Sequence, residues 1–191
     1  SKKVHIDIDP SSINKNVKVD LPIVGDVKTV VAATLKTLKK AKPNFVKSNK
    51  QKTSKWWEKI QKWRSKRSLD YIGSEETIKP QYAIERLYEL TKDKDAYITT
   101  EVGQHQMWAA QHYKFNKPNR WMTSGGLGTM GYGLPAAVGV QVAHPNKLVI
   151  DIAGEASVLM TMQEMSTAVQ YDLPIKIFIL NNEYMGMVRQ W

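Results

Sequence analysis

The first 42 residues contain two hydrophobic patterns of different period. Val4–Asp9 alternates hydrophobic with polar residues and is followed by Pro10, which predicts a short strand. Val27–Lys40 instead carries its hydrophobic residues at helical spacing and predicts a helix. A strand, a long connection and a closing helix form the tail of an α/β unit. This segment holds too few apolar residues to build a hydrophobic core of its own.

Residues 43–69 are polar and rich in lysine, and Ser54 is in a position to cap a helix that runs to Lys66. Three tryptophans lie within this stretch: Trp56, Trp57 and Trp63. Basic residues interleaved with aromatic ones can bind nucleic acid by stacking and phosphate contacts. The alternative is a solvated helix between domains, whose tryptophans pack on neighbours while its lysines face water. Because no recognisable nucleic-acid-binding module is present, we favour the interdomain helix.

From residue 81 onward, predicted helices and strands follow one another in turn. The helices are expected at 81–90, 103–112, 132–143, 161–170 and from 183, and the strands at 96–100, 147–153 and 174–180. Strands that alternate with helices predict an α/β fold, a parallel sheet flanked by helices on both faces. The last helix has barely begun at Trp191, so we expect the chain to be truncated within this domain.

Composition narrows the possible classes of site. The chain has 191 residues, of which 42% are hydrophobic and 24% charged, as in an ordinary globular protein. It has no cysteine, which excludes a disulfide framework, a zinc–thiolate site and a thiol nucleophile.

The formal net charge of +10 belongs to one part of the chain only. Residues 1–70 contain 18 lysines and arginines against 6 acidic residues, whereas residues 71–191 contain 10 against 12. The α/β part is therefore close to neutral, and we expect no nucleic-acid partner.

One long stretch without charged side chains, between Arg120 and Lys147, requires a membrane span to be considered. Six of the eleven glycines lie between Gly125 and Gly139, which is typical of a glycine-rich turn leading into a buried helix. The N-terminus lacks the apolar core of a secretory signal. We therefore expect no membrane partner and a cytoplasmic location.

Polar side chains follow three of the predicted strands, where ligands bind in open parallel sheets. The carboxylate of Glu155 and the carboxamide of Asn182 are oxygen ligands that could complete a magnesium site with phosphate oxygens and water. Ser157 and the following helix start would meet the same phosphate. Equally, Asn181 and Asn182 could only shape a turn, and Glu155 could only cap a helix.

Two further features are weaker signals. The glycines of residues 125–131 suggest a backbone that approaches a flat or phosphorylated ligand closely. His105, taken alone, is more typical of a satisfied turn residue than of a catalyst.

These stretches together resemble the diphosphate-binding domain of thiamine-diphosphate-dependent enzymes. The fingerprint of that family, Gly-Asp-Gly (or Ala)-Ser followed by Asn-Asn, is matched by Gly154–Ser157 and Asn181-Asn182. Four further stretches resemble the acetolactate synthase (acetohydroxyacid synthase) catalytic subunits within this family: 102–111, 124–137, 163–168 and 186–191. Residues 5–10 and 25–27 are similar to the end of the central, flavin-binding domain of those enzymes. The similarity covers nearly the whole chain except the lysine-rich stretch.

The resemblance implies a division into three parts. Residues 1–42 would be the end of a flavin-binding-type domain, residues 43–74 a basic linker with a helix, and residues 75–191 a truncated thiamine-diphosphate-binding domain. It also implies an enzyme that decarboxylates pyruvate and condenses the product with a second 2-oxoacid, in branched-chain amino-acid biosynthesis. The implied cofactors are thiamine diphosphate, Mg²⁺ and FAD, the last without a net redox part.

The resemblance also assigns roles to single residues. Gln104, His105, Ala156 and Ser157 would contact the diphosphate, Met130 the thiazolium, and Gly128 and Met187 the aminopyrimidine. Glu155, Asn182 and the main-chain oxygen of Tyr184 would ligate magnesium, and Trp191 would favour 2-oxobutanoate over pyruvate as acceptor. Asp7, Ile8, Asp26 and Val27 would touch the flavin. The family places its active sites between chains, which implies a homodimer or homotetramer, with a regulatory small subunit as a further partner.

The chain departs from the family pattern in two ways. Glu155 stands where the family has aspartate, and the extra methylene moves the carboxylate by about 1.5 Å if the backbone stays in place. We expect a functional but adjusted magnesium site. The glutamate that activates the aminopyrimidine lies in the N-terminal domain of the family, so we find no catalytic residue in this chain and expect it to be inactive alone.

Three other interpretations stay open at this point. The chain could be part of another thiamine-diphosphate decarboxylase or carboligase, such as glyoxylate carboligase or pyruvate oxidase. It could be a non-catalytic homologue in which Glu155 marks decay of the site. From a different class, it could be a basic nucleic-acid-binding protein using residues 36–67, which predicts strongly salt-sensitive binding.

Overall fold

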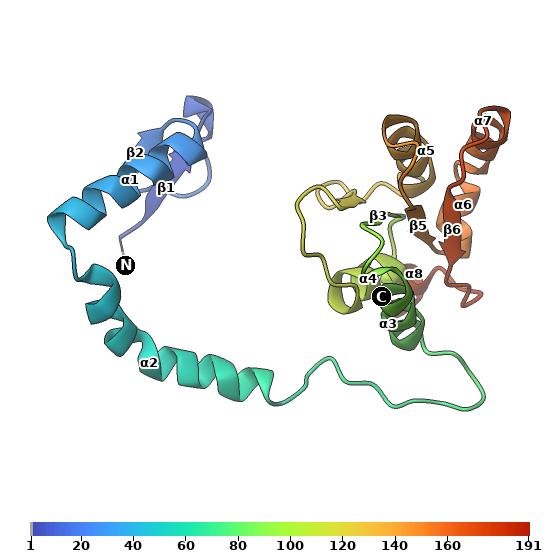
Figure 1. Ribbon diagram of the computed structural model, residues 1–191, viewed down its shortest axis with the longest axis horizontal. Coiled ribbons are helices and arrows are strands. Elements are labelled where there is room, and N and C mark those ends of the chain that lie inside the picture. Colours follow the sequence, from blue (N-terminus) through green and yellow to red (C-terminus); the bar gives the residue numbers. More distant parts are fainter. Residues whose placement is uncertain (1) are drawn as a thin grey trace. The chain divides into compact units, whose positions relative to one another are not determined.

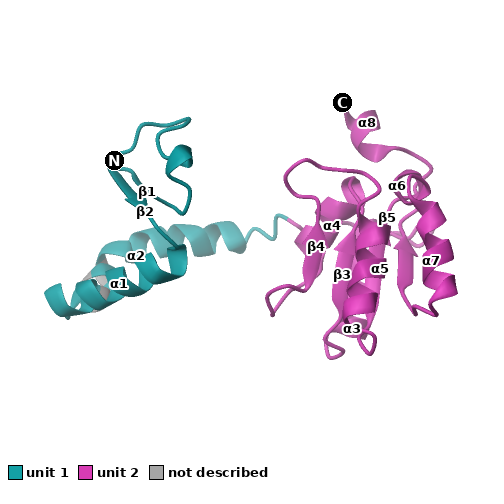
Figure 2. Cartoon of the chain, turned by 90° about the horizontal axis from the view of Figure 1, so that it is seen from above, with its two compact units in different colours: residues 1–68 teal, residues 69–191 magenta. Residues whose placement is uncertain are grey.

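The computed structural model describes residues 2–191, apart from the side chains of four residues within one helix: Val46, Lys47, Ser48 and Gln51. Ser1, the first residue of the expected flavin-domain tail, lies outside the described residues. The chain forms two compact units, divided between Ser68 and Leu69 (Figure 2). We describe each unit by itself.

The first unit contains a small parallel sheet and two helices. Its elements are β1 (Val4–Asp7), the 3-10 helix η1 (Pro10–Ser12), β2 (Leu21–Val24), α1 (Val27–Ala41) and α2 (Phe45–Arg64). β1 pairs with β2 from Val4 opposite Leu21 to Asp7 opposite Val24. The predicted strand and the helix after it are confirmed. The sequence pattern missed β2, because this strand is only four residues long and contains Pro22.

None of the described side chains of this unit joins a buried hydrophobic core, as expected from its few apolar residues. α1 begins at Asp26, whose carboxylate Oδ1 accepts the Thr29 N–H at 2.9 Å. Two of the hydrophobic residues of this helix stay open to solvent, with Val31 44% and Leu35 51% exposed. The unit therefore resembles the edge of a larger structure.

The prediction that Ser54 caps the lysine-rich helix is wrong. α2 begins at Phe45, so Ser54 lies inside it, and the capping position belongs to Asn44. Residues 44–53 include neither glycine nor proline, and lysine and glutamine favour helix, so nothing delays the start.

The tryptophans of α2 also differ from the expectation that they pack on neighbouring elements. Trp56 and Trp63 contact each other edge to face at a centroid distance of 5.6 Å. The ammonium of Lys59 lies 5.7 and 5.1 Å from their ring centroids. All three tryptophans are about half exposed, so within this unit they pack mainly along their own helix.

The second unit is an α/β fold with a parallel sheet, which confirms the predicted fold class (Figure 1). Its elements are α3 (Pro80–Thr91), β3 (Tyr97–Thr100), α4 (Gln104–His112), β4 (Trp121–Thr123), α5 (Gly133–Ala143), β5 (Val149–Ala153), α6 (Glu155–Leu159), η2 (Met162–Glu164), α7 (Met165–Gln170), β6 (Lys176–Ile179) and α8 (Gly186–Gln190). The strand order is β4-β3-β5-β6, with all neighbours parallel. The register places Thr99 opposite Asp151.

Helices cover both faces of this sheet. On one face, Ile84 of α3 and Ala109 of α4 pack with Ile98 and Ile152 of the two central strands. On the other face, Ala137 of α5 packs with strand residues, and α5, α6 and α7 pack together around β5. Both central strands are buried along their whole length, as in parallel sheets in general.

Three local differences from the predicted elements have simple causes. β4 was missed because three residues are too short for a pattern. The helix expected at 161–170 is a 3-10 turn followed by α7, and the hydroxyl of Thr161 donates outward to the carbonyl of Gly131 at 3.2 Å. The helix expected from Glu183 begins at Gly186, because Glu183 has a left-handed φ of 62°.

In the part of the chain that the structure describes, no helix combines the length and the apolar character that crossing a bilayer requires. The uncharged stretch before Lys147 instead forms β4, the glycine-rich loop and α5.

Candidate functional site

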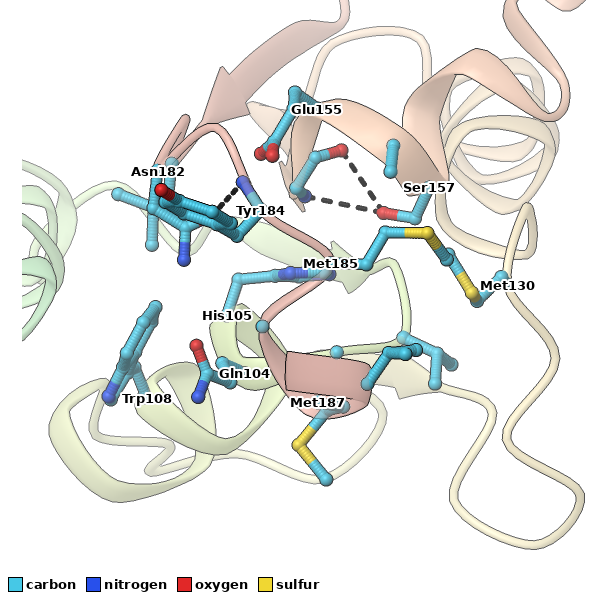
Figure 3. A pocket seen from close by; sticks show the side chains of 17 residues that line it. Gln104, His105, Trp108, Met130, Glu155, Ser157, Asn182, Tyr184, Met185 and Met187 are labelled. Carbon is cyan, nitrogen blue, oxygen red and sulfur yellow. Dashed lines mark hydrogen bonds between the residues drawn. The ribbon is translucent and has the colours of Figure 1, made fainter. Parts of the chain in front are cut away.

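A pocket with about 440 Å³ of empty space lies at the carboxyl ends of the strands of the second unit (Figure 3). The loops after β3, β5 and β6 and the starts of α4, α6 and α8 form its wall. Nine residues singled out from the sequence line it: Gln104, His105, Met130, Glu155, Ala156, Ser157, Asn182, Tyr184 and Met187. The parallel strands thus bring residues up to 83 positions apart to one edge of the sheet.

Six of the predicted residues lie elsewhere. Gly128 does not line the pocket, but a Cβ at this glycine would lie 3.8 Å from Val102, which does. Trp191 follows α8 and is 95% exposed. The four predicted flavin contacts belong to the first unit, at the carboxyl ends of β1 and β2: Asp7, Ile8, Asp26 and Val27.

Glu155 and Asn182 face the same side of the pocket, with Tyr184 next to Asn182 (Figure 3). The Asn182 Oδ1 accepts the N–H of Tyr184 at 3.2 Å, and the Asn181 Oδ1 accepts the N–H of Glu183 at 2.9 Å. The asparagines therefore do shape the turn after β6. A carboxamide oxygen has a second lone pair, so this bond leaves Asn182 able to ligate a cation.

Among the described residues there is no cluster of three histidine, cysteine or acidic side chains that could hold a metal. A cation in this pocket would rest on one carboxylate, Glu155, together with the Asn182 carboxamide and main-chain oxygens. This donor set suits magnesium, which usually takes one or two carboxylates and completes its shell with phosphate and water.

His105 stands in the first turn of α4 and is 94% buried between two glycines. A Cβ at Gly103 would lie 2.7 Å from the Cε1 of its ring, and a Cβ at Gly154 would lie 2.8 Å from Nδ1. Burial lowers the pKa of the imidazole to about 4, although a ring N–H donates to the Glu101 carbonyl oxygen and opposes this. The Nε2 atom is buried without a hydrogen-bond partner in the structure. After uptake of a proton, this nitrogen could donate a hydrogen bond to an anionic ligand.

Gln104, at the start of α4, connects this helix with the last one. Its Nε2 donates to the Oε1 of Gln190 at 3.3 Å, and its side chain lies against Gly186, where a Cβ would clash with it. The segment 186–190 is therefore packed on the pocket through this glutamine.

The Ser157 hydroxyl forms hydrogen bonds within its own turn. Its hydroxyl donates to the Gly154 carbonyl at 3.1 Å and lies 3.3 Å from the Gly154 N–H. This hydroxyl is buried and closes the turn between β5 and α6. It shapes the Gly154–Ser157 segment in the described structure.

The glycine-rich loop reaches the pocket through Met130, on the side opposite Asn182 (Figure 3). Gly128 and Gly131 have φ values of 66° and 85°, which side chains rarely adopt. The Ser124 hydroxyl accepts the Thr129 N–H at 2.9 Å and closes the loop.

Two acidic residues behind this loop, Glu101 and Asp151, have no exposed surface and were not predicted as part of the site. The signal for Asp151 was present, since it is an acidic residue between two isoleucines in a strand predicted to be buried. For Glu101 the sequence offered only its place directly after a strand.

The chain is similar in sequence to known proteins. Residues 101–191 match a family described as thiamine pyrophosphate enzyme, C-terminal TPP binding domain. The chain is 50% identical over 188 residues to the acetolactate synthase isozyme 3 large subunit of Escherichia coli, covering 98% of this chain and 32% of the relative. It is 48% identical over 191 residues to the acetolactate synthase large subunit of Haemophilus influenzae, covering 100% and 32%. The large subunit of Porphyra purpurea is 49% identical over 188 residues, covering 98% and 31%. The chain thus spans about a third of the length of these curated relatives.

Proposed function

Since residues 101–191 belong to the C-terminal binding domain of the thiamine pyrophosphate enzymes, we propose that the chain is the cofactor-binding part of an acetolactate synthase large subunit. The convergence of Gln104, His105, Glu155 and Asn182 on one pocket is the observation that carries this proposal. It is supported by identity of about one half along nearly the whole chain to large subunits of that name.

The pocket suits a diphosphate held through a divalent cation. We assign Glu155, Asn182 and the main-chain oxygen of Tyr184 to Mg²⁺, and Gln104, His105, Ala156 and Ser157 to the diphosphate. The buried Nε2 of His105 supports this assignment, because it has no other partner in the structure. Ser157 acts by shaping its turn, which turns backbone N–H groups toward the diphosphate.

The remaining wall of the pocket is assigned to the rings of the cofactor. Met130 supports the thiazolium, and Gly128 and Met187 line the aminopyrimidine. When bound, thiamine diphosphate supplies a nucleophilic carbon that adds to the ketone of a 2-oxoacid and stores the electron pair released with carbon dioxide. The residues of this chain bind, orient and exclude water around it.

The activity of the whole enzyme would be to join decarboxylated pyruvate to a second 2-oxoacid, pyruvate or 2-oxobutanoate, with Trp191 selecting the acceptor. The resemblance implies that the activating glutamate lies in an N-terminal domain of the family, so we expect the chain alone to be inactive. Further proposals are a homodimer or homotetramer, a regulatory small subunit and a cytoplasmic location. The name of the relatives as large subunits supports the small-subunit partner.

The first unit fits the end of a flavin-binding-type domain. We assign residues 1–42 to it, residues 43–74 to a basic linker, and residues 75–191 to the cofactor-binding domain. Asp7 ends β1 opposite Val24, the last residue of β2, and Asp26 follows two residues later. Ile8 and Val27 at this end are largely exposed. An FAD contact at this edge is our proposal.

Calorimetric titration of thiamine diphosphate into the complete polypeptide tests the proposal. We expect binding only in the presence of Mg²⁺. Asn182→Ala should weaken it at least about tenfold, equal to about 1.4 kcal/mol. Asn181→Ala is the matched control, because Asn181 makes the same kind of turn but does not line the pocket. No binding, or equal binding without the metal, would contradict the proposal.

A substrate screen on the complete enzyme separates acetolactate synthase from other members of the family. We expect acetolactate from pyruvate, and faster reaction with 2-oxobutanoate as acceptor. Product formation only from glyoxylate, or only oxidative decarboxylation of pyruvate, would favour the related carboligases or oxidases instead.

A further inference from the structure

The Glu101 carboxylate lies behind the glycine-rich loop and holds its backbone. Its Oε2 accepts the Gly131 N–H at 2.7 Å, and its Oε1 accepts the Leu134 N–H at 3.0 Å. Both bonds are buried, and the residue has no exposed surface. One side chain after β3 therefore fixes the end of the loop and the first turn of α5 together.

The N–H and the carbonyl of Gly131 both form hydrogen bonds with side chains. Its N–H donates to Glu101, and its carbonyl accepts the Thr161 hydroxyl at 3.2 Å. Its φ of 85° gives it a left-handed turn directly after Met130. The peptide that follows the pocket-lining methionine is thus fixed in position by two side chains from different elements.

A second buried acid lies under the same turn. The Asp151 Oδ1 accepts the Thr99 hydroxyl at 3.0 Å, and its Oδ2 is buried without a partner. Gly133 leaves no room for a side chain here, since a Cβ would lie 2.6 Å from the Glu101 nitrogen and would clash with Asp151. Burial raises the pKa of Glu101, and bonds from four backbone N–H groups oppose this. Burial and the neighbouring Glu101 charge raise the pKa of Asp151 to about 7. Asp151 therefore keeps its proton up to about neutral pH.

We propose that Glu101 is a positioning residue, whose carboxylate sets the place of Met130 in the pocket by holding the Gly131 and Leu134 N–H groups. It touches no substrate or cofactor. The inference rests on the proposed function, in which Met130 supports the thiazolium. The position of Met130 itself is a property of the protein without any cofactor.

The test is a methyl-¹³C spectrum of methionine in the complete polypeptide, recorded without cofactor and assigned with Met130→Leu. Glu101→Gln places an amide where two N–H groups now point, so one of them loses its acceptor. We expect the Met130 methyl signal to shift or broaden in this variant, while those of the other methionines stay. Glu164→Gln is the matched control, an acid of the same unit that does not contact the loop.

The same variants are then titrated with thiamine diphosphate and Mg²⁺. Glu101→Gln should raise the Kd at least about tenfold, and Glu164→Gln should leave it unchanged. If the native protein fails to bind while the Met130 signal responds as expected, the proposed function is wrong and the positioning role stands. An unshifted Met130 signal in folded Glu101→Gln would overturn the inference.

Thr161→Val tests the positioning of Met130 if Glu101→Gln does not fold. It removes the second bond to Gly131 with little change of shape, and we expect a smaller shift of the Met130 signal in the same direction. Thr161→Ser restores the hydroxyl and should return the signal. If the Met130 signal is the same in Thr161→Val and Thr161→Ser as in the native protein, the positioning role is refuted.

Discussion

The Gly154 backbone lies directly against the imidazole of His105, so close that a Cβ there would come within 2.8 Å of the ring nitrogen Nδ1. Gly154 has φ −98° and ψ 156°, a conformation that any residue adopts. The glycine is therefore required by the contact with His105 and not by its backbone. Gly154, the first residue of the fingerprint, is thus needed so that His105 can pack against it.

Gly154→Ala should displace His105 and weaken binding of thiamine diphosphate about tenfold or more, since the ring is enclosed by Gly103 on its other side. Calorimetric titration in the presence of Mg²⁺ measures the effect. Gly139→Ala is the control, because nothing lies within 4 Å of a Cβ there and the site is in the interior of α5. This control should gain about 0.5–1 kcal/mol of stability and bind normally. Normal binding by Gly154→Ala would show that His105 does not contribute to the affinity.

Binding of the diphosphate should be accompanied by uptake of a proton at His105. Burial holds the pKa of this imidazole at about 4, so the ring is neutral at pH 6, and an anion next to Nε2 would raise the pKa. Titrations at pH 6 in buffers of different ionisation enthalpy count the protons taken up. His105→Asn should abolish the uptake. Equal heats in all buffers for the native protein would contradict the assigned contact.

Asp151 makes the stability of this domain fall with rising pH. Its pKa is about 7 in the folded chain, above the ordinary value of an unfolded aspartate, so the folded state keeps a proton that the unfolded state has lost. The stabilisation is complete below about pH 4 and is lost as the pH rises through about 7. Asp151→Asn imitates the protonated acid. The difference in unfolding free energy between native protein and variant should move by about 2–3 kcal/mol in favour of the variant between pH 5 and pH 8.

Urea denaturation at both pH values measures this difference. A constant difference would mean that Asp151 is already ionised in the folded state at pH 5. Because Glu101 is the charged group that acts on Asp151, Glu101→Gln should also reduce the pH dependence.

Glu155→Asp should change the Kd for Mg²⁺ by less than about tenfold, or 1.4 kcal/mol. The longer carboxylate stands at the first position of α6 and already faces the pocket, so a small adjustment of the loop suffices. Glu183→Asp, in the neighbouring turn but outside the pocket wall, is the control. A native protein that binds no cofactor, together with a variant that does, would mean that Glu155 has disabled the site.

The sequence was sufficient for the order of most elements in the second unit, because the periodic helix α3 and the apolar run at β5 have one clear pattern each. It was also sufficient to predict that the loops after β3, β5 and β6 meet at one edge of the sheet, where the pocket lies. Much of the residue-level expectation came from the family resemblance, which periodicity could not supply.

What could not be predicted depended on contacts between distant residues. The start of α2 at Phe45 and the short strands β2 and β4 leave no strong local pattern. The bond of Ser157 to Gly154, and the Glu101 bonds to Gly131 and Leu134, follow from the tertiary fold alone. The pair formed by Glu101 and Asp151 joins positions 50 residues apart, and no spacing rule indicates it.

The strand order β4-β3-β5-β6 has a consequence for where such a pocket can open. After β3 the chain turns to α4 on one face of the sheet, whereas after β5 it turns to α6 on the other. Two adjacent strands thus send their connections in opposite directions and leave a crevice between them, a topological switch point. The path of the backbone between these two strands provides the opening. The fold would therefore accommodate different ligand-binding side chains at this pocket more readily than a different order of its strands.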